Sequence, residues 1–298
     1  SLINDGYEFT SQTDSELIAH MLDYFIKQDN SMIEAMYLAK EKLNGAYAIA
    51  AIDLNNNSNV VVARNKSPLL LGLGTDEIFA ASDPLAIAQL TNDFIFLEDG
   101  DVASISAEEY KIYDASKSKV SRDITHIDIS NQATSKGEFR HHMEKEIYEQ
   151  PEAVLNTIDG RIGGEDVLDN IFGLGSSDLF SKVKRIQIVA CGTSLHAGRV
   201  AANWLSSIAE LPCQIDYASE YRYRNPHVDK NSLFITISQS GETADTLGAL
   251  NYAKEKNYLA SLTICNVPTS SLARESDFSL FTNAGPEIGV ASTKAFTT

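Results

Sequence analysis

The chain contains little cysteine, with only Cys191, Cys213 and Cys265 among 298 residues. Three scattered thiols are too few for a disulfide framework, and they lack the spacing of a zinc site. The sequence also lacks a signal peptide and any long apolar run, the features that mark secreted and membrane-spanning proteins. We therefore expect a soluble protein of the reducing cytoplasm that has no membrane partner.

Basic residues are scarce relative to acidic ones. The chain has 24 lysines and arginines against 41 aspartates and glutamates, which gives a formal net charge of −17 at pH 7. Nucleic acids and anionic membranes attract proteins with basic surfaces. The charge therefore argues against both as partners, and an anionic substrate would depend on local groups to hold it.

A recognisable metal motif is also missing. His141 and His142, together with Glu144 and Glu146, combine metal-binding residue types. Adjacent histidines point to different faces of a helix, however, and the HExxH spacing is absent. We expect neither a metal ion nor a cofactor.

The length of the chain predicts about two domains, the first of which covers residues 1–116. Two helical stretches near its start each begin with a capping-box pattern, Thr13 with Glu16 and Ser31 with Glu34. Short strand-like runs separated by turns follow them. Runs this short and this close together favour antiparallel pairing, so we expect an α+β fold.

The rest of the chain has a different pattern. Residues 117–140 are polar and predict a linker, and Pro151 is expected to divide the helical segment that follows. Residues 141–298 then alternate strand-like and helical runs, which is typical of an α/β fold with a doubly wound, parallel, five-stranded sheet. We expect its strands at residues 185–190, 214–218, 233–237, 259–265 and 278–281.

The run SQSGET, residues 238–243, lies where the third of these strands gives way to a helix. Unpaired N–H groups and the helix dipole attract anions at such a point, and the hydroxyls of Ser238, Ser240 and Thr243 can surround a phosphate. No P-loop lysine is present, which favours a sugar phosphate over a nucleotide. The alternative is helix capping, but one cap needs one side chain, so we favour the phosphate site.

Two further loops are expected near this one. The first strand ends in the run CGTS, residues 191–194, and a strand order of 2-1-3-4-5 would place both loops beside one crevice. Cys191 has no identifiable base beside it, so we favour a packing or lining role over a nucleophilic one. Residues 287–294, after the fifth strand, are expected either to close the same crevice or to form an ordinary loop capped by Ser292 or Thr293.

Several long motifs, in this order, resemble those of the glutamine-fructose-6-phosphate aminotransferase family. They are CGTS at Cys191, ASEYRYR at Ala218, SQSGETADT at Ser238, ICNVPTSSLARESD at Ile264 and EIGVASTKAFTT at Glu287. The resemblance covers essentially the whole chain, and HHMEKEIYEQP at His141 is similar to the helix that joins the family's domains. It implies a partial glutaminase domain of the N-terminal-nucleophile type, which is a class II glutamine amidotransferase domain, followed by the first sugar isomerase (SIS) domain.

The resemblance also implies a function. The family converts fructose 6-phosphate and glutamine to glucosamine 6-phosphate and glutamate, a step towards UDP-N-acetylglucosamine, and its members form homodimers through the SIS region. Asp14 would hold the amino group of glutamine, although the sequence alone favours a first-turn acid stabilised by the helix dipole. The residues implied to bind the sugar phosphate are Thr193, Ser194, Ser238, Gln239, Ser240, Thr243, Val290 and Ser292.

The chain departs from the family's pattern at both ends. It begins with Ser1 and Leu2, without the family's catalytic N-terminal cysteine or its oxyanion-hole Asn-Gly, and it ends at Thr298, before a second SIS domain. We therefore interpret it as an internal fragment without catalytic residues, inactive by itself. The alternative is a non-catalytic SIS-type sugar-phosphate sensor, against which the antiparallel first half and the lack of a basic DNA-reading helix both argue.

Overall fold

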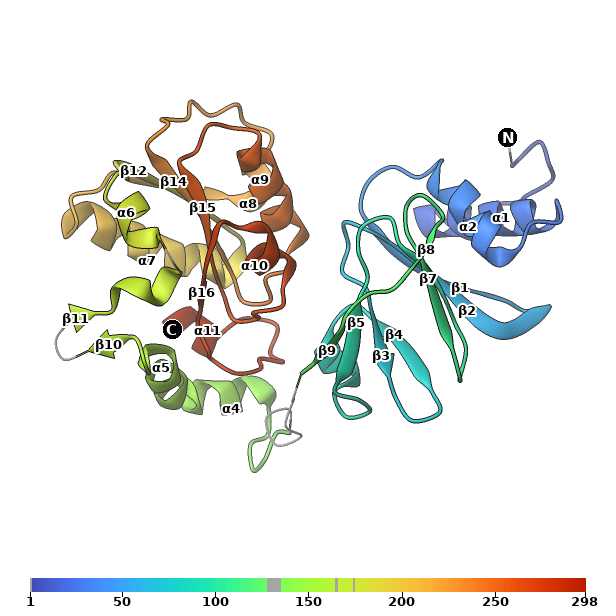
Figure 1. Ribbon diagram of the computed structural model, residues 1–298, viewed down its shortest axis with the longest axis horizontal. Coiled ribbons are helices and arrows are strands. Elements are labelled where there is room, and N and C mark those ends of the chain that lie inside the picture. The colour runs from blue at the N-terminus through green and yellow to red at the C-terminus, as the bar shows by residue number, and fades with distance from the viewer. Residues whose placement is uncertain (1, 128–134, 164–165, 174) are drawn as a thin grey trace. The chain divides into compact units, whose positions relative to one another are not determined.

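The computed structural model describes residues 2–127, 135–163, 166–173 and 175–298 (Figure 1). The chain divides into two compact units, Ser1–Asn131 and Gln132–Thr298. Each unit has hydrophobic clusters of its own and is described by itself.

Two helices open the first unit, α1 (Asp14–Ile26) and α2 (Met32–Lys40). The capping box predicted for α2 is confirmed. The Ser31 hydroxyl accepts a hydrogen bond from the amide of Glu34, and the Glu34 carboxylate accepts one from the amide of Ser31. These two bonds satisfy donors that the first turn of a helix cannot pair internally.

The capping box predicted for α1 is wrong. Thr13 is the N-cap residue, but its side chain makes no cap hydrogen bond. The Glu16 carboxylate instead accepts from the amides of Thr10 and Ser11, each at 2.7 Å. Glu16 therefore holds the chain segment that precedes the helix rather than the N-cap residue.

Short strands follow and pair antiparallel, as predicted. They form two sheets, of order β1-β2-β6-β7-β8 and β4-β3-β5-β9, and Pro84 begins the short 3-10 helix η1 (Pro84–Ile87) between β4 and β5. The strands are β1 (Tyr47–Asp53), β2 (Asn56–Asn65), β3 (Leu70–Leu73), β4 (Ile78–Ala81), β5 (Asp93–Phe96), β6 (Val102–Ile105), β7 (Tyr110–Tyr113), β8 (Lys119–Val120) and β9 (Ile124–His126).

The first unit has three layers: the helices, the first sheet and the second sheet. Side chains that follow one another in a strand point to opposite faces, so β2 contacts both of its neighbouring layers. On β2, Val61 and Ala63 pack with Met36 of α2 in one buried cluster. Val62, between them, packs with Leu71 and other buried residues of the second sheet in another cluster. The first sheet is therefore covered by the helices on one face and by the second sheet on the other.

The structure differs from the expected linker at residues 117–140. Strands β8 and β9 lie within that stretch and pair antiparallel with β7 and β5. Such short polar strands carry no hydrophobic alternation that the sequence could reveal. Residues 119–120 and 124–126 therefore belong to the sheets of the first unit, whereas residues 128–134 lie outside the described part.

The second unit begins with the helices α4 (His142–Tyr148) and α5 (Gln150–Ile158). Pro151 lies in the first turn of α5, so the predicted division of this helical segment is confirmed. The short elements that follow are β10 (Ile162–Gly163), β11 (Asp166–Val167), η2 (Asp169–Phe172) and α6 (Ser176–Phe180).

A parallel five-stranded sheet forms the centre of the second unit (Figure 1). Its order, β13-β12-β14-β15-β16, is the predicted 2-1-3-4-5. Its strands are β12 (Arg185–Ala190), β13 (Cys213–Tyr217), β14 (Ser232–Ser238), β15 (Ala260–Cys265) and β16 (Phe278–Phe281). Its helices are α7 (Gly192–Ser207), α8 (Ala218–Tyr221), α9 (Ala244–Lys254), α10 (Ser271–Glu275) and α11 (Lys294–Thr297).

Helices cover both faces of this sheet. Phe234 of β14 packs with Leu250 of α9 and with residues of α8 and α10. Its neighbours Leu233 and Ile235 pack with Leu205 of α7 and with residues of α6. The carboxyl ends of the strands are left to the connecting loops, which is where parallel α/β sheets bind ligands.

Candidate functional site

Three loops at the carboxyl ends of the parallel strands line one open cavity of about 370 Å³. The strands β12 and β14 are neighbours in register, with Ala190 opposite Ile237, so the loops that follow them lie side by side. The loop after β16 supplies the third wall. The lining residues are Cys191, Gly192, Thr193, Ser194, Ile237, Ser238, Gln239, Ser240, Thr243, Val290, Ala291 and Ser292.

All eight residues expected to bind a sugar phosphate lie on this cavity. The lining also includes Gly192 and Ala291, which lie within the predicted loops, and Ile237, the residue before Ser238. Cys191 lines the cavity, as expected for it, and is partly exposed. The roles of these residues as ligands stay predictions.

The first wall is the junction of β12 and α7. Cys191 is the N-cap residue, in an extended conformation and without a side-chain cap. Gly192, at the start of the helix, has a φ of +56°, a left-handed value that glycine adopts without strain. The first turn of α7 carries no acidic residue. Its amides have no acceptor within the helix and no carboxylate of that turn beside them, which suits an anion.

The second wall is the junction of β14 and α9, where hydroxyl groups close the loop. The Ser238 hydroxyl accepts a hydrogen bond from the amide of Gly241 at 3.1 Å and lies 3.1 Å from the hydroxyl oxygen of Thr243. Ser240 accepts from the amide of Glu242 at 3.2 Å. Thr243 is the N-cap residue of α9, but its side chain makes no cap hydrogen bond. The hydroxyls of this loop are therefore not used as ordinary helix caps.

Contacts with the segment that follows β15 and with α10 fix this loop. The amide of Asn266 donates to the carbonyl of Gln239, and the amide of Leu272 donates to the carbonyl of Gly241, both at 3.1 Å. Gly241 has a φ of +66°. The loop is thus held from outside the cavity, which leaves Ser238, Ser240 and Thr243 on its inner side.

The third wall contains Val290, Ala291 and Ser292, just before α11. Thr293 is the N-cap residue of α11, yet its side chain makes no cap hydrogen bond. Its hydroxyl contacts the carboxylates of Glu146 and Glu287 instead. The expected alternative, an ordinary loop capped by Ser292 or Thr293, therefore does not describe this segment.

Asp14 lies in the first unit, as the first residue of α1 and on the surface. Glu16 is the second acid of that first turn. This position suits the helix-dipole interpretation, and the glutamine-binding role of Asp14 stays a prediction.

Within residues 2–127, 135–163, 166–173 and 175–298, no three side chains of His, Cys, Asp or Glu are grouped as metal ligands would be. Across the same stretches, every helix is too short or too polar to span a bilayer.

Two parts of the chain match known protein families. Residues 179–298 match the family described as SIS domain. This stretch includes all three loops of the cavity. Residues 1–89 match the family described as glutamine amidotransferase domain.

Longer matches cover nearly the whole chain. It is 51% identical over 293 residues to a glutamine–fructose-6-phosphate aminotransferase (isomerizing) of Vibrio vulnificus, and this match covers 98% of the chain and 48% of that protein. It is 52% identical over 293 residues to the protein of the same name from Pseudomonas putida, with the same two coverages. The chain thus spans about half the length of the curated relatives it matches.

A solved structure is similar to part of this chain in sequence and shape. It is described as the C-terminal domain of glucosamine-fructose-6-phosphate aminotransferase from Francisella tularensis. The match has 54% identity and a TM-score of 0.53, and it covers 55% of this chain and 46% of that one.

Proposed function

We propose that this chain, a member of the glutamine-fructose-6-phosphate aminotransferase family, forms part of an enzyme that converts fructose 6-phosphate and glutamine to glucosamine 6-phosphate and glutamate. Identity of about half over 98% of the chain supports the reaction. The observation that carries the proposal is the cavity, where hydroxyl-rich loops and two helix starts converge at the carboxyl edge of a parallel sheet.

The second unit would hold the sugar phosphate. Among the described residues that line the cavity, none is a lysine or an arginine, so hydroxyls, amides and helix dipoles must balance the charge of the phosphate. Ser238, Ser240 and Thr243 would donate hydrogen bonds to phosphate oxygens, together with Ser194 and the first amides of α7 and α9. Thr193, Gln239, Val290 and Ser292 would contact the rest of the sugar.

The first unit would belong to the glutaminase half of the enzyme. We assign it to the N-terminal-nucleophile fold, with residues 1–116 as the later part of a class II glutamine amidotransferase domain. Asp14 would hold the amino group of glutamine, because a carboxylate pairs with an ammonium group. Ammonia released there would be the nitrogen donor at the sugar site. We assign no catalytic residue to this chain.

The remaining features of the family complete the proposal. Residues 141–298 would form the first SIS domain, doubly wound, and the enzyme would act as a cytoplasmic homodimer joined through its SIS region. Its product would serve the formation of UDP-N-acetylglucosamine. The glutamine amidotransferase match of residues 1–89 argues against the alternative of a lone sugar-phosphate sensor.

Calorimetric titration of the chain with fructose 6-phosphate tests the site. Thr243→Val keeps the shape of the side chain but removes a hydroxyl that no helix cap requires. Combined with Ser238→Ala, it should weaken binding by about 1.5 to 3 kcal/mol for each charge-assisted hydrogen bond lost.

The matched control is Ser207→Ala, which removes a hydroxyl at the far end of α7, where it donates to the carbonyl of Asn203. This variant should bind like the wild type, and free fructose should bind much more weakly than its phosphate. Wild-type affinity in the double variant would reject the assigned site.

A further inference from the structure

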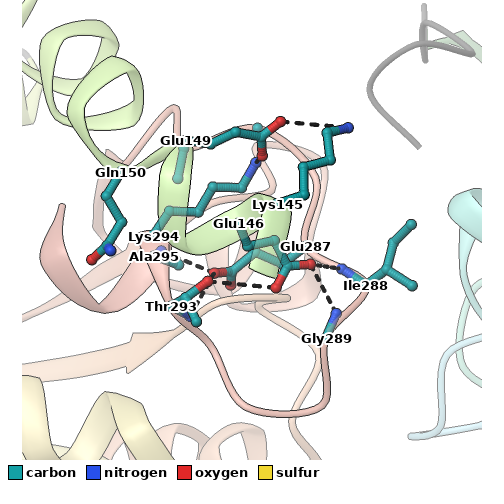
Figure 2. Close-up of polar contacts among 12 residues, drawn as sticks. Lys145, Glu146, Glu149, Gln150, Glu287, Ile288, Gly289, Thr293, Lys294 and Ala295 are labelled. Carbon is teal, nitrogen blue, oxygen red and sulfur yellow. Dashed lines mark hydrogen bonds and ion pairs between the residues drawn. The ribbon is translucent and has the colours of Figure 1, made fainter. Parts of the chain in front are cut away.

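The side chain of Glu146, on α4, reaches the loop that forms the third wall of the cavity (Figure 2). Its Oε1 accepts hydrogen bonds from two consecutive amides, of Ile288 at 2.6 Å and of Gly289 at 2.8 Å. Its Oε2 lies 3.4 Å from the hydroxyl oxygen of Thr293. Glu146 is only 3% exposed, and a carboxylate taken out of water needs donors of this kind. The buried carboxylate and the loop therefore stabilise one another.

A second carboxylate holds the other end of the same loop. Oε1 of Glu287 accepts hydrogen bonds from the amides of Thr293 at 2.8 Å and Ala295 at 3.2 Å, and Glu287 is 8% exposed (Figure 2). Attachments at residues 288–289 and at Thr293 thus flank the three residues that line the cavity. The wall is a short span held at both of its ends.

Apolar packing does not hold this span. Val290 is fully exposed and Ala291 is exposed, so neither side chain anchors the wall by burial. Gly289 brings the backbone unusually close to its anchor, since a Cβ at this residue would lie 2.6 Å from Oε2 of Glu146. The position of the wall therefore depends on hydrogen bonds from the main chain to Glu146 and Glu287.

We propose that Glu146 is a positioning residue of the sugar-phosphate site. Its buried carboxylate holds Val290–Ser292 at the cavity, so that a ligand bound by the first two loops also contacts this third loop. Glu146 does not line the cavity itself and acts through the amides of Ile288 and Gly289. The inference rests on the proposed function, because it assumes that a sugar phosphate fills the cavity.

Two variants of Glu146 separate positioning from folding. Glu146→Ala removes both acceptors, so it should weaken fructose 6-phosphate binding by at least about tenfold and speed amide hydrogen exchange at residues 288–292. Glu146→Gln keeps one carbonyl oxygen that can accept from both amides, so it should restore most of the affinity.

Asp277→Ala is the matched control. The Asp277 carboxylate also accepts from one amide and one hydroxyl, both of Ser261, but at the opposite ends of β15 and β16 from the cavity. This variant should lower stability without changing affinity. Gly289→Ala serves as a second probe if Glu146→Ala does not fold, because its added methyl group crowds the same contact while the chain keeps the Glu146 carboxylate.

Each outcome decides the proposal. Wild-type affinity in both Glu146→Ala and Gly289→Ala would overturn it, as would an equal loss of affinity in Asp277→Ala. If the wild-type chain binds no fructose 6-phosphate, the proposed function fails, and hydrogen exchange alone decides the role of Glu146. Unchanged exchange at residues 288–292 in Glu146→Ala would then refute positioning.

Discussion

Gly241 lies directly against Ser270, so closely that a Cβ at residue 241 would stand 2.1 Å from the Ser270 hydroxyl oxygen. That hydroxyl caps α10 by accepting from the amide of Ala273. Gly241 also has a φ of +66°, which side chains other than glycine rarely adopt. The second wall of the cavity and the start of α10 therefore share one crowded contact.

Gly241→Ala should destabilise the second unit more than a positive φ alone explains. Gly160→Ala is the control, since Gly160 has a φ of +67° with nothing within 4 Å of an added Cβ. We expect a cost of about 1 to 2 kcal/mol for Gly160→Ala and a further 1 to 3 kcal/mol or so for Gly241→Ala from overpacking. Urea denaturation measures both, and equal losses would contradict the steric argument.

The two capping-box sequences of the first unit should respond differently to alanine. Ser31→Ala removes a working cap and should cost about 1 kcal/mol of unfolding free energy. Thr13→Ala removes a hydroxyl that caps nothing and should cost no more than about 0.5 kcal/mol. Thermal or urea unfolding of the two variants checks this order, and the reverse order would show that the caps are misassigned.

Glu16 should stay ionised at pH values well below those at which a glutamate ordinarily becomes protonated. Hydrogen bonds from the Ser11 hydroxyl and then from the Thr10 amide lower the pKa of this carboxyl from 4.5 to about 2. A lowered folded-state pKa means that its contribution to stability is complete above about pH 4.5 and is lost as the pH falls through about 2. Carboxyl carbon NMR should show this midpoint, and Ser11→Ala should raise it. A wild-type midpoint near 4.5 would contradict the hydrogen bonds.

The sequence predicted the parallel sheet well. The strands expected at 185–190 and 278–281 agree with β12 and β16 residue for residue. Continuous apolar runs bounded by polar turns are clear signals, since strands covered on both faces need them. The strand order 2-1-3-4-5 was an assumption, which the structure confirms, and that order brings the loops after β12 and β14 together.

Local competition explains what the sequence could not predict in the first unit. Thr13 and Glu16 have the spacing of a capping box, but the Glu16 carboxylate binds the amides of Thr10 and Ser11 instead. Sequence spacing does not show which of these amides the carboxylate will bind. Likewise β8, with only Lys119 and Val120, forms because β7 lies beside it, and its sequence has no strand pattern of its own.

At the candidate site, too, the sequence does not predict a contact, here between residues far apart in the chain. In sequence, Glu146 stands among residue types that can bind metals, whereas the partner that the structure gives it, Ile288, is 142 positions away and has no spacing that predicts the contact. The sequence does not mark Glu146 as buried, because the buried residues Ala153 and Thr157 belong to the next helix, α5. A buried charge needs a partner, but only the fold identifies it.

Cys191 and Thr243 are the N-cap residues of α7 and α9, and neither uses its side chain as a cap, whereas Ser270 caps the neighbouring α10. Both helices are therefore less stable at their starts than a better choice of residue would make them. An aspartate at residue 243 would strengthen α9, yet its charge would repel a phosphate from the cavity. Under the proposed function, a bound phosphate would supply the acceptors that these two helix starts lack, so the missing caps would favour ligand binding at some cost in stability.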